Sequence, residues 1–484
     1  MKITVKKPNI LLITTDQQRY DTVGAAAPDF MRTPHTDFLM REGVTFENCY
    51  VQSPACVPSR MSMMTGMSPQ ALGLYNNSGA RGLLDGNART MPRVMNDLGY
   101  HTIAVGKMHF DPERARHGFQ EMILPRDYYN KMAKSGQPLQ PMRHGLGQNE
   151  MYPGMATVPE AMTLTSFITE ECVEYIENRR DPDVPFFMWC SYSKPHPPLD
   201  PPEPYYSMYR QSPIKPPVCG QWAQPENAPE SFNRFRHKWS TDLLPTPIIK
   251  EARAAYYGLI TQCDYNMGRI FSALQDIGEL NNTLIIYTSD HGEFLGDHQA
   301  VGKFFPYEQS IHVPFVLRPP KSMAGELAGT HSHQLVSLMD ILPTIAKFAG
   351  GDAGEFEGKD LFNLAAQYET RAFLTGAYLG DGDYIYLVQG RYKYIYYPEG
   401  AREQLFDIVD DREDMVDLAG DARYAATLEA MRHTLLQEQK ARGSKFVEGD
   451  AFVKLPVAED TEQERRAGSW PGFHTEYCPI DVLH

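Results

Sequence analysis

The chain has 484 residues, more than one ordinary hydrophobic core supports, so two or three domains are expected. Apolar residues make up 42% and charged residues 22%, a globular composition that excludes a wholly disordered protein. The net charge of −15 argues against a protein that coats nucleic acid, because phosphate binding needs a basic surface. An anionic small-molecule substrate remains possible, since a few local cations can outweigh distant charge.

The sequence contains no run that approaches the roughly 18 apolar residues of a membrane-spanning helix. Its first residues pass directly into a strand-like stretch and lack the apolar centre of a signal peptide. We therefore expect a cytoplasmic protein with neither a membrane nor a nucleic acid as partner. The seven scattered cysteines form no Cys-x-x-Cys pair, so free thiols are predicted.

Strand and helix patterns alternate through about the first 360 residues. This alternation predicts an α/β fold with a large, mainly parallel central sheet flanked by helices. Near-continuous apolar runs predict strands buried on both faces. These strands are expected at residues 10–15, 102–106, 186–190 and 284–289. The helices are expected at residues 36–42, 91–98, 164–179, about 248–275 and 337–348.

Two long loops interrupt this alternation, one over about residues 124–157 and one over about 194–247. The second is rich in proline. Loops of this length inside a compact domain usually serve as lids, substrate walls or subunit contacts.

After about residue 362 the pattern changes to short aromatic strands at 384–388, 392–397 and 404–407. They predict a small antiparallel sheet, covered on one face by a helix over about 424–441. We expect a catalytic domain over 1–362 and a small α+β subdomain over 363–484. The irregular tail that ends the subdomain suggests a contact with another subunit, and hence a homo-oligomer.

Each strand of the large sheet is followed at once by ionisable residues. The carboxyl ends of parallel strands meet at one edge of a sheet, where open α/β folds bind ligands. The residues that follow the four strands are Asp16 and Gln17, Lys107 and His109, His196, and Asp290 and His291. We expect them to converge on one site.

The sequence Cys56-Val57-Pro58-Ser59-Arg60 opens a helical pattern. Pro58 suits a first helical turn, where its missing N–H carries no penalty. Cys56 is then expected at a helix N-terminus, where backbone amides and the helix dipole favour anions.

This pentapeptide, followed by Thr65-Gly66, resembles the signature of the type I sulfatases, in which the cysteine is oxidised to formylglycine. The family belongs to the alkaline phosphatase superfamily. Other segments resemble the landmarks of the family in the family's order, over nearly the whole chain. These segments are 9–16, 106–109, 194–196, 289–292, 302–303 and 404–407 with Glu413.

The resemblance implies an arylsulfatase-like enzyme that hydrolyses a sulfate monoester, whether aryl, small alkyl or sugar sulfate. The hydrated aldehyde derived from Cys56 would attack sulfur and release the alcohol, and its second hydroxyl would then expel sulfate. It also implies a formylglycine-generating maturase as a partner.

A divalent metal is implied as well. Its ligands by resemblance are Asp16, Gln17, Cys56, Asp290 and His291. Gln17 and His291 depart from the commonest pattern of Asp-Asp and Asp-Asn. A set of two carboxylates, an amide oxygen and an imidazole fits manganese or magnesium as well as calcium. Relatives with Gln and His at these positions include phosphonate monoester hydrolases and enzymes like choline-sulfatase.

The resemblance also assigns the remaining site residues. Arg60 and Lys107 would hold the formylglycine side chain, and His109 would take the proton of the hydrate. His196 and Lys303 would bind the ester oxygens, and one of them would protonate the leaving group. Asn76 or Asn77 would add a further polar contact.

Two other functions are compatible with this sequence. A phosphonate monoester hydrolase or phosphodiesterase on the same scaffold would suit Gln17 and His291. A catalytically inactive binding protein would keep the fold with an unmodified Cys56 and no metal. Residues 296–303 resemble a phosphate-binding loop only superficially, because five residues separate the two glycines and Phe304 replaces the required Ser or Thr. We expect Glu293, Asp297 and His298 to lie at the surface or behind the metal ligands.

Overall fold

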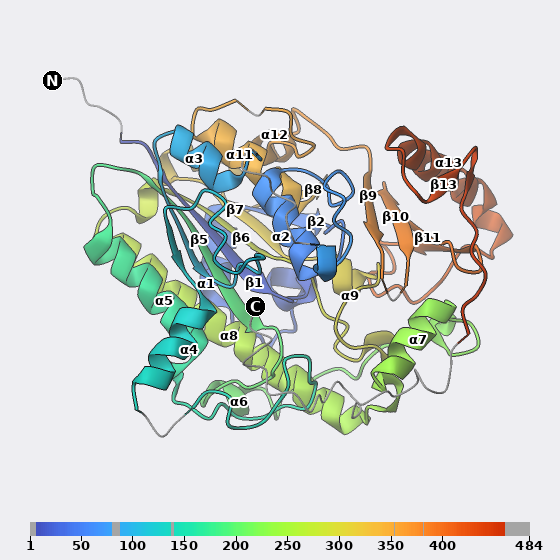
Figure 1. Ribbon diagram of the computed structural model, residues 1–484, viewed down its shortest axis with the longest axis horizontal. Helices are drawn as coiled ribbons and strands as arrows, with labels where there is room; N and C mark the ends of the chain where they lie inside the picture. Colours follow the sequence, from blue (N-terminus) through green and yellow to red (C-terminus); the bar gives the residue numbers. More distant parts are fainter. Residues whose placement is uncertain (1–5, 80–87, 137–139, 353, 381, 460–484) are drawn as a thin grey trace.

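The computed structural model describes residues 6–79, 88–136, 140–352, 354–380 and 382–459. An eight-stranded sheet forms the centre of the described chain, in the order β4-β3-β5-β1-β6-β7-β2-β8 (Figure 1). Its strands are β1 (Asn9–Asp16), β2 (Val44–Cys49), β3 (His101–Gly106), β4 (Glu121–Ile123), β5 (Phe186–Pro195), β6 (Thr283–Ser289), β7 (Phe315–Arg318) and β8 (Thr330–Val336). Strand β7 runs antiparallel to β6 and β2, and the other neighbours pair in parallel. The predicted mainly parallel sheet is confirmed.

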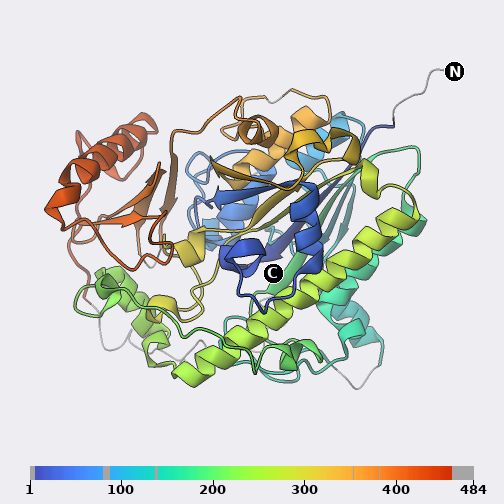
Figure 2. The same ribbon diagram turned by 180° about the vertical axis from the view of Figure 1, so that it is seen from behind.

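Helices cover both faces of this sheet. Alternate residues of β1 face opposite sides: Ile10 and Leu12 join one core, and Leu11 and Ile13 join the other. Helices α2 (Cys56–Thr65), α3 (Met91–Asp97) and α11 (Ile341–Phe348) pack on the first face. Helices α1 (Pro34–Glu42), α5 (Leu164–Glu174) and α8 (Thr246–Asp276) pack on the second. Figure 2 shows α8, the longest of them, running along that face.

The predicted helices are present with small shifts of their ends. The helix expected over 164–179 is split, because α5 ends at Glu174 and a π-helical turn continues over Tyr175–Arg179. The helix expected from residue 337 begins with a 3-10 turn over Leu338–Asp340. The remaining short helices are α6 (Tyr205–Met208), α9 (Glu308–Ile311), α10 (Lys321–Ala324) and α12 (Leu361–Ala365).

A second, antiparallel sheet lies beside the large one, as predicted (Figure 1). Its order is β12-β11-β10-β9, and its strands are β9 (Leu374–Tyr378), β10 (Tyr384–Gln389), β11 (Tyr392–Tyr397) and β12 (Arg402–Asp407). Helix α13 (Ala425–Ala441) buries Leu428, Met431 and Leu435 against it. The boundary between residues 362 and 363 stays a prediction.

The two long loops contain more helix than the sequence indicated. The first begins with helix α4 (Pro125–Lys134), so the prediction of a continuous loop was wrong there. Pro125 occupies the first turn, and the carboxylate of Asp127 accepts the backbone N–H of Leu124 at 2.9 Å. Tyr128 and Met132, four residues apart, bury one face of this helix. The second loop contains α6 and α7 (Glu230–Lys238).

The C-terminal segment also has local structure. A short hairpin of β13 (Val447–Glu448) and β14 (Ala451–Phe452) interrupts the predicted irregular tail. Residues 460–484, which carry most of that tail, lie outside the described residues. The predicted homo-oligomer and cytoplasmic location stay predictions.

Two further findings concern the whole described chain. None of its helices combines the length and the apolar character needed to cross a bilayer. The six described cysteines are free thiols, as predicted, and Cys478 lies outside the described residues.

Candidate active site

The residues that follow β1, β3, β5 and β6 lie together at the carboxyl edge of the large sheet. Asp16 ends β1, Lys107 follows β3, His196 follows β5 and Asp290 follows β6. Gly106 fixes one of these strand ends, because its φ is +102° and a Cβ there would lie 2.0 Å from the carbonyl oxygen of Ser191. The close approach of β3 to β5 therefore requires glycine immediately before Lys107.

Helix α2 brings Cys56 to the same edge. All ten of its residues are buried, and Cys56 is its first residue. The side-chain oxygen of Asn77 accepts the backbone N–H of Val57 at 3.1 Å, and the Ser59 hydroxyl donates to the backbone carbonyl of Asp290. The first contact ties the N-terminus of α2 to the segment around Asn77, and the second ties it to the loop that follows β6.

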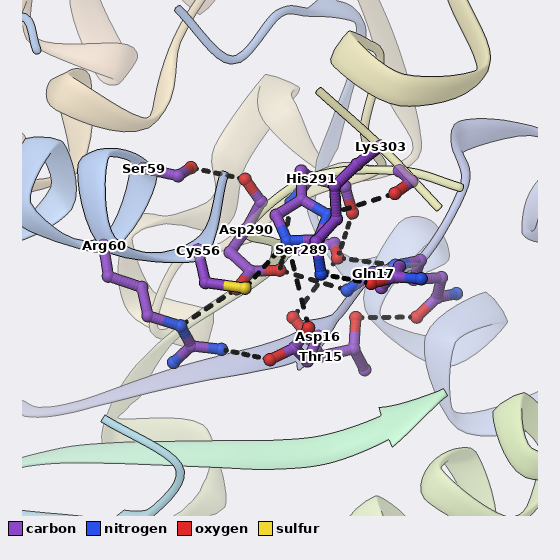
Figure 3. Close-up of polar contacts among 12 residues, drawn as sticks. Thr15, Asp16, Gln17, Cys56, Ser59, Arg60, Ser289, Asp290, His291 and Lys303 are labelled. Carbon is purple, nitrogen blue, oxygen red and sulfur yellow. Dashed lines mark hydrogen bonds and ion pairs between the residues drawn. The ribbon is translucent and has the colours of Figure 1, made fainter. Parts of the chain in front are cut away.

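Four potential ligands converge at this point (Figure 3). One ligand atom from each of Asp16, Cys56, Asp290 and His291 lies within 4.8 Å of the others, and all four residues are buried. The His291 Nε2 atom is 3.2 Å from the Cys56 sulfur, 3.9 Å from Asp16 Oδ1 and 3.7 Å from Asp290 Oδ1. Among the described residues, Asp16 Oδ1 finds no hydrogen-bond partner although it is buried. The group is therefore arranged for a ligand that its own side chains do not supply.

Two cations balance the carboxylates. Arg60 donates from Nε to Asp290 at 2.9 Å and from a terminal nitrogen to Asp16 at 3.2 Å. Its other terminal nitrogen donates to the Lys107 carbonyl at 2.5 Å and to the Ser191 hydroxyl at 2.8 Å. The Lys107 ammonium lies 2.5 Å from Asp16. Arg60 thus holds the ends of β1, β3, β5 and β6 together while it neutralises charge.

This charge arrangement shifts the ionisation of the central groups. Burial disfavours the charged form of Asp16, but the charges of Lys107, His196, Arg60 and Lys303 outweigh it and hold its pKa well below the usual range. Burial likewise opposes ionisation of Cys56, yet the pKa of its thiol is held well below the usual range by nearby cations, Lys303 first among them. The electric field at residue 56 therefore favours negative charge.

Gln17 uses its side chain to position Lys303. Its amide oxygen accepts from the Lys303 ammonium at 2.6 Å, and its amide nitrogen donates to Glu293. The backbone of Gln17 is left-handed, with φ +69°. Gln17 as a metal ligand stays a prediction, since its oxygen would have to share or leave Lys303.

His109, His196 and Lys303 line a cavity of about 320 Å³ that opens onto Cys56. Burial, then the charges of Lys303 and Lys107, lower the pKa of His196 well below its usual value, so this imidazole is neutral at neutral pH. Its Nδ1 lies 2.7 Å from the Pro197 carbonyl, which fixes the proton on that nitrogen. The backbone of His109 is left-handed, with φ +58°, and its buried Nδ1 has no partner among the described residues.

The two candidate asparagines, Asn76 and Asn77, make different contacts. Asn77 lines the cavity, whereas Asn76 donates its amide to the Leu379 carbonyl at 2.5 Å in the small sheet. The structure thus brings together every predicted site residue except Asn76, which instead links the site loop to β9.

Three further residues, Glu293, Ser59 and Ser191, support the site from outside the cavity lining. Glu293 is buried, as the position behind the ligands suggested, and its carboxylate accepts from Gln17 and from the backbone N–H of Leu295 and Gly302. Ser59 and Ser191 hold Asp290 and Arg60. Ser59 belongs to the Cys-x-Pro-Ser-Arg motif, which is a signal for its role, but Ser191 lies inside an ordinary buried strand and gives none.

Comparison with known proteins supports one family. The sequence matches the Sulfatase family over residues 8–351, and residues 296–441 match the family described as N-sulphoglucosamine sulphohydrolase, C-terminal. It is 31% identical to an arylsulfatase of Clostridium perfringens, over 93% of this chain and 98% of that one. It is 28% identical to a choline-sulfatase of Rhizobium meliloti, over 89% of this chain and 86% of that one.

Solved structures share the fold. A phosphonate monoester hydrolase of Agrobacterium radiobacter superposes with a TM-score of 0.76 at 24% identity, covering 90% of this chain and 96% of that chain. A structure in complex with its substrate D-glucosamine-2-N,6-O-disulfate gives a TM-score of 0.72 at 22% identity, covering 90% and 98%. The family match, which extends over most of the chain, agrees with the geometry at Cys56. The chain therefore belongs to the sulfatase family of sulfuric ester hydrolases.

Proposed function

We propose that this protein hydrolyses a sulfate monoester to an alcohol and sulfate, with a formylglycine made from Cys56 as the nucleophile. The observation that carries the proposal is the position of the Cys56 sulfur, 3.2 Å from His291 Nε2 and within 4.8 Å of ligand atoms of Asp16 and Asp290. A hydrated aldehyde here supplies two hydroxyls on one carbon, one to displace the alcohol from sulfur and one to expel sulfate afterwards.

The buried ligand group fits one divalent metal ion. Asp16, Asp290, His291 and residue 56 would hold it, and Asp16 Oδ1 has a free lone pair among the described residues. A bound ion would lower the pKa of the attacking hydroxyl and screen the sulfate oxygens. One imidazole beside two carboxylates favours manganese or magnesium and still admits calcium.

The remaining side chains would bind and orient the ester. Lys107 and Lys303 supply positive charge on the cavity side of residue 56, and Gln17 holds Lys303 through a 2.6 Å hydrogen bond. Arg60 pairs with the carboxyl groups of Asp16 and Asp290 between the strand ends. The anionic ester would therefore be held with its sulfur facing residue 56.

Proton transfers would fall to the two histidines. His196 keeps a proton on Nδ1 for the Pro197 carbonyl, so the neutral ring has none on Nε2. It would take up a second proton there from solvent when the anionic ester binds beside it, and would pass that proton to the leaving oxygen. His109 has an unpartnered buried Nδ1 among the described residues and lines the cavity with Cys56, so it would accept the hydrate proton.

One experiment tests the core of this proposal. The protein is produced together with a formylglycine-generating maturase, the partner that the proposal requires, and the peptide around residue 56 is weighed by mass spectrometry. We expect a mass lower than the cysteine form by about 18 Da, the difference between a thiol-bearing and an aldehyde-bearing side chain, with about one divalent ion per chain. An unmodified thiol and no metal in fully active protein would refute it.

A second candidate is hydrolysis of a phosphonate monoester or phosphodiester on the same scaffold. Gln17 and His291 favour it, because relatives with these residues include phosphonate monoester hydrolases. Comparing kcat/KM on p-nitrophenyl sulfate with that on a phenyl phosphonate monoester decides between the two. We expect the sulfate ester to be preferred, and a large preference for the phosphonate would reverse the assignment.

A further inference from the structure

The cavity in front of Cys56 has two chemically different halves. The half near residue 56 carries the cationic and imidazole groups already described. We call the rest of the lining the outer half; it contains apolar and aromatic side chains together with polar ones such as Gln148, Asn149 and Gln262. Its wall includes Leu124, Tyr128, Tyr129, Val158, Leu164 and Phe304. This outer half is where the alcohol part of a bound ester would lie, since the sulfate end must face residue 56.

Phe304 is the aromatic residue nearest to the charged half, because it directly follows Lys303. The Lys303 ammonium lies 5.8 Å from the centre of its ring, and the ring packs against Tyr378 with the two ring centres 5.6 Å apart. Its backbone has φ +89°, a left-handed conformation that bulky residues rarely adopt. The fold thus holds an aromatic ring in this place at a cost in backbone energy.

Helix α4 provides the facing wall. The rings of Tyr128 and Tyr129 meet edge to face at 67°, with their centres 5.0 Å apart. The Tyr128 hydroxyl donates to the Met162 carbonyl at 2.7 Å, so its polar end is occupied. Burial raises the pKa of Tyr129, which keeps its phenol neutral. This wall offers aromatic surface and no charge.

The charged groups of the outer half are already paired. The Lys194 ammonium forms an ion pair with Asp200 and donates to the Pro198 carbonyl at 2.6 Å. The second oxygen of Asp200 lies 3.1 Å from His144. Glu113 pairs with Arg126 at 3.2 Å. Among the described residues that line this half, the only cation is therefore Lys194, and a carboxylate already neutralises it.

We propose that the alcohol part of the substrate is an uncharged ring that carries a single sulfate ester, with Phe304 as the residue that selects it. The proposal rests on the proposed sulfate ester hydrolysis. A ring would lie against Phe304 and Tyr129, which both line the cavity, and stacking and burial of apolar surface would hold it. A second sulfate on the same molecule would enter a region whose only cation is occupied, next to the carboxylates of Glu113 and Asp200. This chain would thus differ from the structural neighbour whose substrate is a glucosamine disulfate.

The first test compares esters with the same kind of leaving group on the matured enzyme. Cyclohexylmethyl sulfate, glucose 6-sulfate and glucosamine-2-N,6-O-disulfate all release a primary alcohol, so differences in kcat/KM report binding of the alcohol part. We expect kcat/KM to fall in that order, by at least about tenfold from first to last. The reverse order would overturn this proposal alone. If neither these esters nor p-nitrophenyl sulfate were hydrolysed, the proposed function would fail and this proposal with it.

The second test separates the Phe304 ring from its strained backbone. In Phe304→Ala and Phe304→Gly, we expect the ratio of kcat/KM on cyclohexylmethyl sulfate to that on methyl sulfate to fall about tenfold. Glycine accepts φ +89° freely, so equal losses in both variants assign the effect to the ring. A ratio that stays at the wild-type value in both variants would remove Phe304 as the selecting residue. Tyr368→Ala is the matched control, since that aromatic side chain is 86% exposed.

Discussion

Two of the buried charge clusters among the described residues differ in how far they satisfy themselves. The first is the active-site group around Cys56. The second lies where the large sheet meets the small one, and consists of Lys393, Glu308 and Asp414. The Lys393 ammonium binds Glu308 at 2.9 Å and Asp414 at 2.6 Å, and all three side chains are fully buried. We call it the junction cluster.

The junction cluster is closed by the protein at both oxygens of Glu308 and at one of Asp414, and among its described carboxyl oxygens only Asp414 Oδ1 has no partner. His312 lies 2.9 Å from Glu308, Tyr50 donates to the same carboxylate at 3.0 Å, and the backbone N–H of Glu308 donates to Asp414 at 2.7 Å. Burial raises the pKa of Asp414 to about 7, so its carboxyl is about half protonated at neutral pH, whereas Lys393 and His312 overcome burial and lower the pKa of Glu308 to about 2. The active-site group instead faces a cavity and directs several ligand atoms at one point. Similar buried side chains thus stabilise the fold in the junction cluster and form the reactive site around Cys56.

The largest expected effect is the loss of activity when the nucleophile of the active-site group is removed. Cys56→Ala should lower kcat on p-nitrophenyl sulfate by roughly 10⁵-fold or more, because the residue that would bond to sulfur is gone. The fold should persist, with an unchanged circular dichroism spectrum. Cys219→Ser, at a half-buried thiol outside the cavity lining, serves as the control and should keep activity. Residual turnover in Cys56→Ala would refute the nucleophile assignment.

The next largest effect concerns His196. If it protonates the leaving group, His196→Ala should slow hydrolysis of alkyl sulfates by about 10²- to 10⁴-fold and of p-nitrophenyl sulfate much less. A nitrophenolate leaves without a proton, so the two kcat values separate the roles. Exposed His331 provides a neutral control as His331→Ala. Equal losses on both esters would limit His196 to binding.

The junction cluster should show the opposite response, a change in stability rather than in chemistry. Lys393→Met leaves two buried carboxyls without their cation and should lower the free energy of unfolding by about 3–5 kcal/mol. Urea titration measures this value. Lys440→Met is the control, since Lys440 pairs with Asp450 at the surface and should matter by less than about 1 kcal/mol. Similar losses in the free energy of unfolding for the two variants would show that the junction cluster does not stabilise the fold.

The smallest expected effect is a dependence of folding stability on pH near the junction cluster. His298 lies next to the junction cluster, with Nε2 2.9 Å from the Glu413 carbonyl, and burial lowers its pKa to about 4. The unfolded chain therefore binds a proton below about pH 6.5 that the folded chain refuses until about pH 4, so stability is lost as pH falls through this window. From pH 7 to pH 5 we expect a loss of about 2 kcal/mol from this residue.

Urea titrations at the two pH values measure that loss. His298→Gln, which keeps a neutral donor and acceptor, should lose correspondingly less stability between them. The same pH dependence in both proteins would assign the acid sensitivity to another group.

Much of the active site could be predicted because its residues follow strands that the sequence makes plain. Asp16, Lys107, His196 and Asp290 each come directly after an apolar run, and parallel topology alone brings such ends together. The junction cluster could not be found this way. Glu308, Lys393 and Asp414 are 85 and 21 positions apart along the chain, and each one alone has the appearance of a surface residue.

Helix α4 was missed for a related reason. Its segment contains Tyr128, Tyr129 and Met132, but only the packing of Tyr128 and Met132 against α5 and its surroundings shows which face is buried. Short amphipathic segments beside long loops depend on tertiary contacts more than on their own propensity. The aromatic wall of the cavity therefore became visible only in the folded chain.

Gln17, His109 and Phe304 share left-handed backbone angles at one rim of the molecule. Glycine would adopt each of these angles with an energy saving on the order of 1 kcal/mol, yet it would delete a side chain that lines the cavity at His109 and Phe304 or holds Lys303 at Gln17. Selection for thermal stability alone would therefore favour glycine at these three positions. The resulting enzymes would be more stable but inactive. Directed evolution of a more stable enzyme from this fold therefore needs a screen that also measures turnover in every round.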